Sequence, residues 1–168
     1  MGDARSFRLE IEQFISREVP QKVVDTQKRM VAEALTLIVQ ATPVGNNTRW
    51  VSNVKRKAAY DRNVRGLTKR KPFQYLPKGY VGGHARKNWR VSIGSPNYAE
   101  TPGEDVVGQQ TLSLGYAVAG AIREPSTVWI SNPLPYMQRL EEGWSKQAPT
   151  GMVANAVRLI TEKYRRVS

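Results

Sequence analysis

The chain has 168 residues, a formal net charge of +12 and no cysteine, which excludes disulfides and thiolate metal sites. This length is typical of one domain with a single core, and an apolar content of 40% is that of a globular chain rather than a disordered tail or a membrane protein. No apolar run approaches the roughly 18 residues that span a bilayer, so we expect neither a membrane segment nor a secretory signal.

The first predicted element is a long amphipathic helix. Apolar side chains between residues 24 and 38 recur at helical spacing, with charged side chains on the other faces. Thr42 precedes a proline and therefore avoids the helical region, so the helix is predicted to end there after about five turns. A weaker helical pattern covers residues 7–19, and Pro20 is expected to end or kink that segment.

A basic segment from Val44 to Arg90 follows this helix and carries the excess charge. Between Arg49 and Arg90 there are 13 Lys or Arg and one acidic residue, Asp61, whereas the rest of the chain has 13 of each sign. Residues 44–83 show neither helical nor strand periodicity, so we predict a long loop. Its aromatic side chains argue against disorder. The side chains expected to contact DNA or an acidic partner are Arg49, Lys55, Arg56, Lys57, Arg62, Arg65, Lys69, Arg70, Lys71 and Lys78.

The remainder of the chain predicts three strands and two helical segments. Alternating apolar side chains indicate strands over residues 89–93, 111–119 and 127–131. One or two helical turns are expected over residues 136–142, and a closing helix over residues 152–166. Each element has one apolar face, so the predicted fold class is α+β, with a small antiparallel sheet of three or more strands packed against the long N-terminal helix and the C-terminal helix. Open sheet edges favour an oligomer.

Residues that could support catalysis are scarce. His84 is the only histidine and lies in a glycine-rich turn, which favours a structural role over catalysis or zinc binding. Glu141 and Glu142 are adjacent, so on a helix they point about 100° apart and are interpreted as a solvated helix end. The sequence has neither a nucleotide-binding loop nor a His-Glu-x-x-His motif. We therefore expect no catalytic activity, no cofactor and no metal.

The composition of the basic segment leaves two interpretations open. Basic side chains mixed with aromatic ones are typical of a surface that contacts phosphates and stacks on bases. A solvated loop, or one that faces an acidic protein, explains the same composition equally well. Nothing resembles a recognition helix, so any contact with DNA is expected to be with the backbone.

The segments that flank the basic stretch resemble the HK97 gp10-like family of tailed-phage neck and tail-completion proteins. In that family a Thr-Pro-Val-Asp-Thr-Gly element leads quickly into an Arg-x-Asn-Trp strand. Here Gly45-Asn46-Asn47 replaces Asp-Thr-Gly, and about forty residues are inserted before the strand. The matching blocks are Ala41-Thr42-Pro43-Val44, Arg86-Lys87-Asn88-Trp89, Val91-Ser92-Ile93-Gly94, Trp129-Ile130-Ser131-Asn132, Leu134-Pro135-Tyr136, Arg139-Leu140-Glu141-Glu142-Gly143-Trp144-Ser145, Gln147-Ala148-Pro149 and Gly151-Met152-Val153.

The resemblance implies a small α+β virion protein without catalytic activity, copied around a ring at the head–tail junction and present in the host cytoplasm during assembly. The implied partners are further copies of the chain, in a ring of six or twelve, and other connector and tail proteins. No contact with a membrane is implied. Packaged DNA would be reached through the basic loop at residues 45–87 of the single domain. A different class of function, a nucleic-acid-binding protein without sequence specificity, remains the alternative. The ring interface is expected at Pro135, Tyr136, Leu140, Glu141, Gly143, Trp144 and Ser145.

Overall fold

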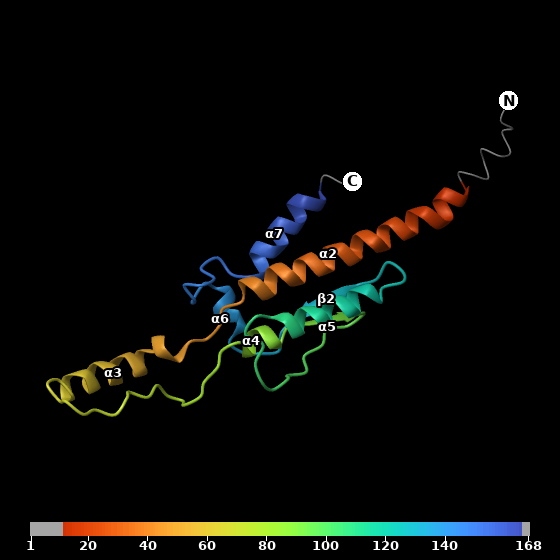
Figure 1. Cartoon of the computed structure of the whole chain (residues 1–168). Helices are drawn as coiled ribbons and strands as arrows, with labels where there is room; N and C mark the ends of the chain where they lie inside the picture. The colour runs from red at the N-terminus through yellow and green to blue at the C-terminus, as the bar shows by residue number, and fades with distance from the viewer. Residues whose placement is uncertain (1–11, 166–168) are drawn as a thin grey trace.

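The computed structural model describes residues 12–165, which are mostly helical (Figure 1). A short π-helix, η1, leads into α2, and η2 is a short 3-10 helix. No helix among the described residues is both long and apolar enough to cross a membrane. In chain order the elements are η1 (Phe14–Glu18), α2 (Val19–Ala41), η2 (Asn47–Arg49), α3 (Val51–Asn63), α4 (His84–Lys87), β1 (Arg90–Ile93), α5 (Gln109–Gly120), β2 (Val128–Ser131), α6 (Met137–Glu141) and α7 (Val153–Tyr164).

The central element is α2, with α5 and α7 packed on different sides of it (Figure 1). Its predicted end is confirmed, because Thr42 adopts an extended backbone and its hydroxyl donates to the Ile38 carbonyl at 2.7 Å. Pro20 does not end the helix, since it falls in the first turn of α2, where a backbone N–H is not needed. The part of the predicted N-terminal segment before residue 12 lies outside the described residues.

The prediction of a sheet with three or more strands is wrong. The described residues form one two-stranded antiparallel sheet, in which β1 pairs with β2 and Val91 lies opposite Ile130. Residues 111–119, predicted to be a further strand, belong to helix α5. The fold is therefore mostly helical, with a small sheet, rather than an α+β sandwich.

The composition of α5 explains why its alternating pattern was misleading. Leu114 and Tyr116, which suggested the apolar face of a strand, are both exposed. The buried side of the helix consists of small residues four positions apart, Thr111, Gly115 and Ala119. A Cβ atom on Gly115 would collide with the side chain of Leu35, so the small residues allow α5 to approach α2 closely. The helical period is thus present, but in residues with little hydrophobicity.

The hydrophobic core lies between α2, the sheet and the C-terminal third of the chain. The helical segments predicted after residue 135 are confirmed as α6 and α7, with residue 166 outside the described range. The buried core residues are Leu35, Ile38, Val39, Ala85, Trp89, Val91, Leu134, Met137, Ala148, Met152 and Ala156.

Residues 47–80 form an arm that extends away from the rest of the chain, which we call the body (Figure 1). The prediction of a loop is wrong over α3, a helix of 13 residues that spans about 20 Å. The chain then returns to the body without a further helix or strand. Between residues 48 and 81 only Asn53 is buried, so the arm contributes nothing to the core of the body.

Candidate functional site

The arm holds most of the positive charge of the protein. Residues 49–78 contain ten basic residues and one acidic residue, a net charge of +9 out of the total of +12. Nine of the ten basic side chains are exposed, and Lys57 is partly buried beside Asp61, with Nζ 2.6 Å from the carboxylate. The structure thus brings all ten predicted contact residues together on one projection.

The three remaining basic residues of the predicted segment, Arg86, Lys87 and Arg90, belong to the body. Arg86 has a structural role, because its guanidinium donates to the carbonyls of Gln40 and Thr42 at 3.0 and 2.9 Å. These carbonyls lie at the C-terminal end of α2, where no intrahelical donor remains. Burial lowers the pKa of Arg86, although the nearby Asp105 carboxylate raises it.

A buried asparagine holds α3 to the returning chain. Asn53 is 1% exposed, and its Nδ2 donates to the carbonyls of Asn47 and Leu76 at 2.7 and 2.6 Å. Its Oδ1 accepts from the backbone N–H of Leu76 at 3.0 Å and from the guanidinium of Arg56 at 2.9 Å. These four bonds use the full hydrogen-bonding capacity of the amide. No local sequence pattern predicts this role, since the partners of Asn53 include Leu76, which is 23 positions away.

The aromatic side chains of the arm pack against one another. The ring centroids of Tyr60 and Phe73 are 5.4 Å apart, and those of Phe73 and Tyr75 are 5.0 Å apart. The Arg56 guanidinium lies 5.4 Å from the Phe73 centroid, and the Tyr60 hydroxyl donates to the carbonyl of Lys71. These rings stabilise the arm and are already in contact with side chains. The arm therefore presents basic groups suited to phosphates or carboxylates rather than free rings suited to stacking on bases.

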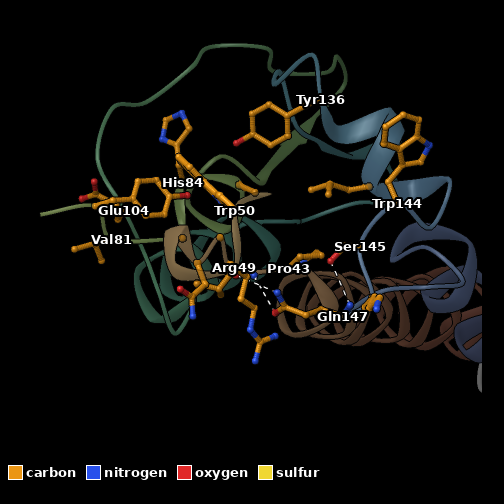
Figure 2. A pocket seen from close by; sticks show the side chains of 18 of the residues that line it. Pro43, Arg49, Trp50, Val81, His84, Glu104, Tyr136, Trp144, Ser145 and Gln147 are labelled. Atoms are coloured by element: carbon orange, nitrogen blue, oxygen red, sulfur yellow. Dashed lines mark hydrogen bonds between the residues drawn. The ribbon is translucent and has the colours of Figure 1, made fainter. Parts of the chain in front are cut away.

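A cleft of about 860 Å³ lies where the arm joins the body (Figure 2). The arm contributes Trp50 and Tyr80, whose ring centroids are 4.9 Å apart, and the body contributes Tyr136 and Trp144. Burial raises the pKa of Tyr136, and Tyr80 and the Glu100 carboxylate raise it further. Four aromatic residues around one opening make this cleft a candidate contact surface for a protein partner.

Four of the predicted ring-interface residues line this cleft, and Pro135, Glu141 and Gly143 do not; the four are Tyr136, Leu140, Trp144 and Ser145. Pro135, Tyr136 and Trp144 are exposed, with Trp144 at 72%. Leu140 packs against the hydrophobic core, although it also lines the cleft. Ser145 lines the cleft as well, and its hydroxyl accepts from the backbone N–H of Gln147 at 3.2 Å. Gly143 has a positive φ of 81° and approaches the Pro149 carbonyl closely, so it shapes the turn.

The interpretation of Glu141 as part of a solvated helix end is wrong. Its carboxylate accepts from the backbone N–H groups of Met152, Val153 and Ala154 at 2.8–2.9 Å and so caps the N-terminus of α7. Burial raises the pKa of Glu141, but the three N–H donors outweigh it and hold the pKa below its ordinary value. Glu142, its neighbour, is exposed as predicted.

Blocks of the sequence that carry the resemblance meet at the root of the arm. Trp89 Nε1 donates to Thr42 Oγ1 at 2.8 Å, and both residues are buried. The Gln147 amide exchanges two hydrogen bonds with the backbone of Val44, at 3.1 and 3.3 Å. The segments before and after the arm are thereby joined to each other and to the loop that follows α6.

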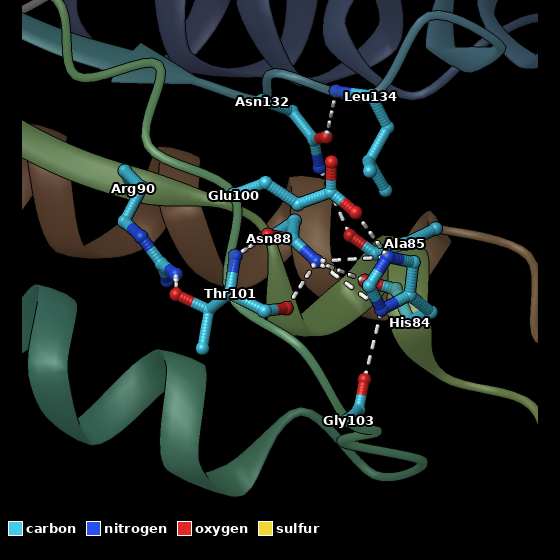
Figure 3. Close-up of polar contacts among 9 residues, drawn as sticks. All are labelled: His84, Ala85, Asn88, Arg90, Glu100, Thr101, Gly103, Asn132 and Leu134. Carbon is cyan, nitrogen blue, oxygen red and sulfur yellow. Dashed lines mark hydrogen bonds and ion pairs between the residues drawn. The ribbon is translucent and has the colours of Figure 1, made fainter.

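His84 is part of a polar network that ties α4 to the segment before α5 (Figure 3). Its Nδ1 lies 2.9 Å from the Gly103 carbonyl and its Nε2 lies 3.1 Å from Glu100 Oε1. Asn88, which is fully buried, bonds to the backbone of Thr101 at 2.7 and 3.1 Å. Among residues 12–165, no group of three or more His, Cys, Asp or Glu side chains is placed to hold a metal ion.

No family model, no curated protein and no solved structure matches this sequence or its fold. The features from which function can be argued are therefore the basic arm, the aromatic cleft at its root and the contacts that join the flanking segments.

Proposed function

We propose that this protein is a structural component of a tailed-phage particle, which forms a ring with other copies at the head–tail junction and acts in neck or tail completion. The observation that carries the proposal is the contact cluster at the root of the arm. Residues of the family-like blocks on both sides of the insertion, Thr42 and Trp89, bond to each other. If these short blocks resembled the family only by chance, there would be no reason for them to pack against one another in the fold. Their contact therefore supports the proposal.

The shape of the arm favours an assembly role rather than catalysis. Its helix is stabilised by its own returning chain and exposes Val51 and Val54 to solvent at 70% and 52%. Exposed apolar side chains on a projecting element are a common mark of a protein–protein contact. The arm and the cleft at its root would contact further copies or other connector and tail proteins within the virion, after assembly in the host cytoplasm.

Electron microscopy and mass measurement of the purified protein and of phage particles test this proposal. We expect rings whose native mass is six or twelve times that of one chain, and stoichiometric amounts of the protein in intact particles. A monomer at all accessible concentrations, together with absence from purified particles, would overturn the proposal.

The charge of the arm supports a second candidate, a nucleic-acid-binding protein without sequence specificity. The five basic residues from Arg62 to Lys71 are all exposed. If each neutralises one phosphate, the logarithm of the affinity for duplex DNA falls with the logarithm of salt concentration at a slope of about −4.5. Such binding by a monomer that forms no ring favours this candidate over the connector. Binding that is weak and insensitive to salt excludes it.

A further inference from the structure

The outer side of α3 combines apolar and basic side chains and faces solvent. At 100° per residue, five positions fall within a stripe about 100° wide, opposite Asn53 and Tyr60 on the side that packs against the returning chain. All five are exposed, including Val51 at 70% and Val54 at 52%. We call this set the outer stripe: Val51, Val54, Lys55, Ala58 and Arg62.

The segment before α5 has the opposite charge and also exposes apolar side chains. Residues 94–108 contain three acidic residues and no Lys or Arg, and we call this segment the acidic loop. Asp105 is buried, whereas Glu100 and Glu104 are exposed. The large exposed apolar side chains of the acidic loop are Tyr98 at 65%, Val106 at 41% and Val107 at 72%.

The acidic loop is held in place by side chains of the body. The Asp105 carboxylate accepts from the backbone N–H and the hydroxyl of Thr111 at 2.8 and 2.9 Å. Asn88 holds Thr101, and His84 bonds to the Gly103 carbonyl (Figure 3). A loop fixed in this way loses little conformational freedom when a partner binds. Its exposed valines and carboxylates are thus presented in a set position.

We propose that the outer stripe of one copy docks on the acidic loop of a second copy. The two surfaces match in charge and in kind, with two basic and three apolar residues in the stripe against two exposed carboxylates and three large exposed apolar side chains in the loop. Within one chain both surfaces remain open to solvent, so each is available to a second copy. The proposal rests on self-assembly of the chain, as in the proposed function.

The contact joins different surfaces of two identical chains. Such a head-to-tail contact leaves a free stripe at one end and a free loop at the other, so it repeats from copy to copy and forms a ring when the rotation between neighbouring copies closes. The basic residues beyond the stripe, from Arg65 to Lys71, take no part in it and stay available to another partner.

Charge reversal on each surface tests the docking. Light scattering should show that Lys55→Glu/Arg62→Glu and Glu100→Lys/Glu104→Lys each reduce the native mass of the wild-type assembly to that of a single chain. A chain that carries all four changes should recover the assembly, because the two charges are exchanged. Lys69→Glu/Arg70→Glu is the matched control, since it changes the charge of the arm equally but outside the stripe, and it should assemble normally.

Cysteine cross-linking supplies a second measurement, for which the cysteine-free chain is well suited. Ala58→Cys places a thiol on the stripe and Val107→Cys places one on the acidic loop. A short bismaleimide should link the two variants when they are mixed and should link neither variant to itself, because the contact is head-to-tail. Circular dichroism of each variant establishes that it is folded.

The outcomes separate this inference from the proposed function. An assembly that survives both stripe and loop reversals, or that is lost equally in the control, overturns the docking but not the proposed function, which rests on the assembly of the wild-type protein. Wild-type protein that is monomeric at every concentration overturns both. Loss of assembly in the single-surface variants with recovery in the combined chain supports the docking.

Discussion

The indole Nε1 of Trp89 donates a hydrogen bond to the hydroxyl of Thr42, 2.8 Å away, across 47 residues of sequence. Thr42 ends α2, and Trp89 immediately precedes β1, so this bond closes the body directly beneath the arm. Gly45 and Gly82 also approach each other closely, since a Cβ on Gly82 would collide with the Gly45 carbonyl. The arm is therefore an excursion whose two ends meet and which adds no residue to the core cluster of the body.

Deletion of the arm should leave the body folded. Replacing residues 47–80 with two glycines removes the buried Asn47 and Asn53 but no residue of the core cluster. Because the ends of the arm meet, a short linker can close the gap without strain. Thermal unfolding should remain one cooperative transition, and loss of that transition would show that the arm supports the core.

Substitution of Asn53 by Ala should loosen the arm alone. The change leaves the backbone groups of Leu76 without their side-chain partner, at a local cost of about 1–3 kcal/mol. Hydrogen exchange should accelerate in α3 and in the returning chain while α2 and α5 remain protected. Ser52→Ala, at the exposed neighbouring position, is the control and should leave exchange unchanged. Unaltered exchange in Asn53→Ala would argue against the clamp.

Glu141→Gln should produce a stability difference that depends on pH. The folded-state pKa of Glu141 is lowered, so its contribution is fully present above the unfolded-state pKa of about 4.3 and is lost as the pH falls through the folded value. Urea denaturation at neutral pH should show a loss of about 1 kcal/mol, typical of a helix cap. The difference should shrink in acid, whereas exposed Glu142→Gln should have little effect at either pH.

Tyr136→Ala and Trp144→Ala should leave heads and tails unjoined while the protein stays soluble. Both side chains are exposed at the cleft, at 42% and 72%, so their removal creates no cavity in the core. Counting of joined particles in phage that carry each variant provides the measurement. Val157→Ala, another exposed apolar position outside the cleft, is the control. Normal particle yield from both cleft variants would argue against an interface there.

Local rules were enough to predict α2, β1, β2 and the helices after residue 135. The end of α2 follows from the residue before Pro43, and the alternation around Val91 correctly indicated a strand. These elements bury aliphatic side chains on one face, which is the signal that a sequence displays most clearly.

The two long helices that escaped prediction, α3 and α5, have inner faces that are not aliphatic. The inner face of α5 is small, around Gly115, and that of α3 is polar and aromatic, around Asn53 and Tyr60. The roles of Asn53 and Glu141 depend on backbone groups more than ten residues away, which no local pattern reveals. The positive charge of the arm, by contrast, was evident from the composition of residues 49–78.

The native mass of the purified protein is the most direct test of ring assembly. We predict an assembly of six or twelve copies that appears as a ring in electron micrographs and persists at physiological salt. A single-chain mass at every protein concentration, with no rings on the grid, would contradict it.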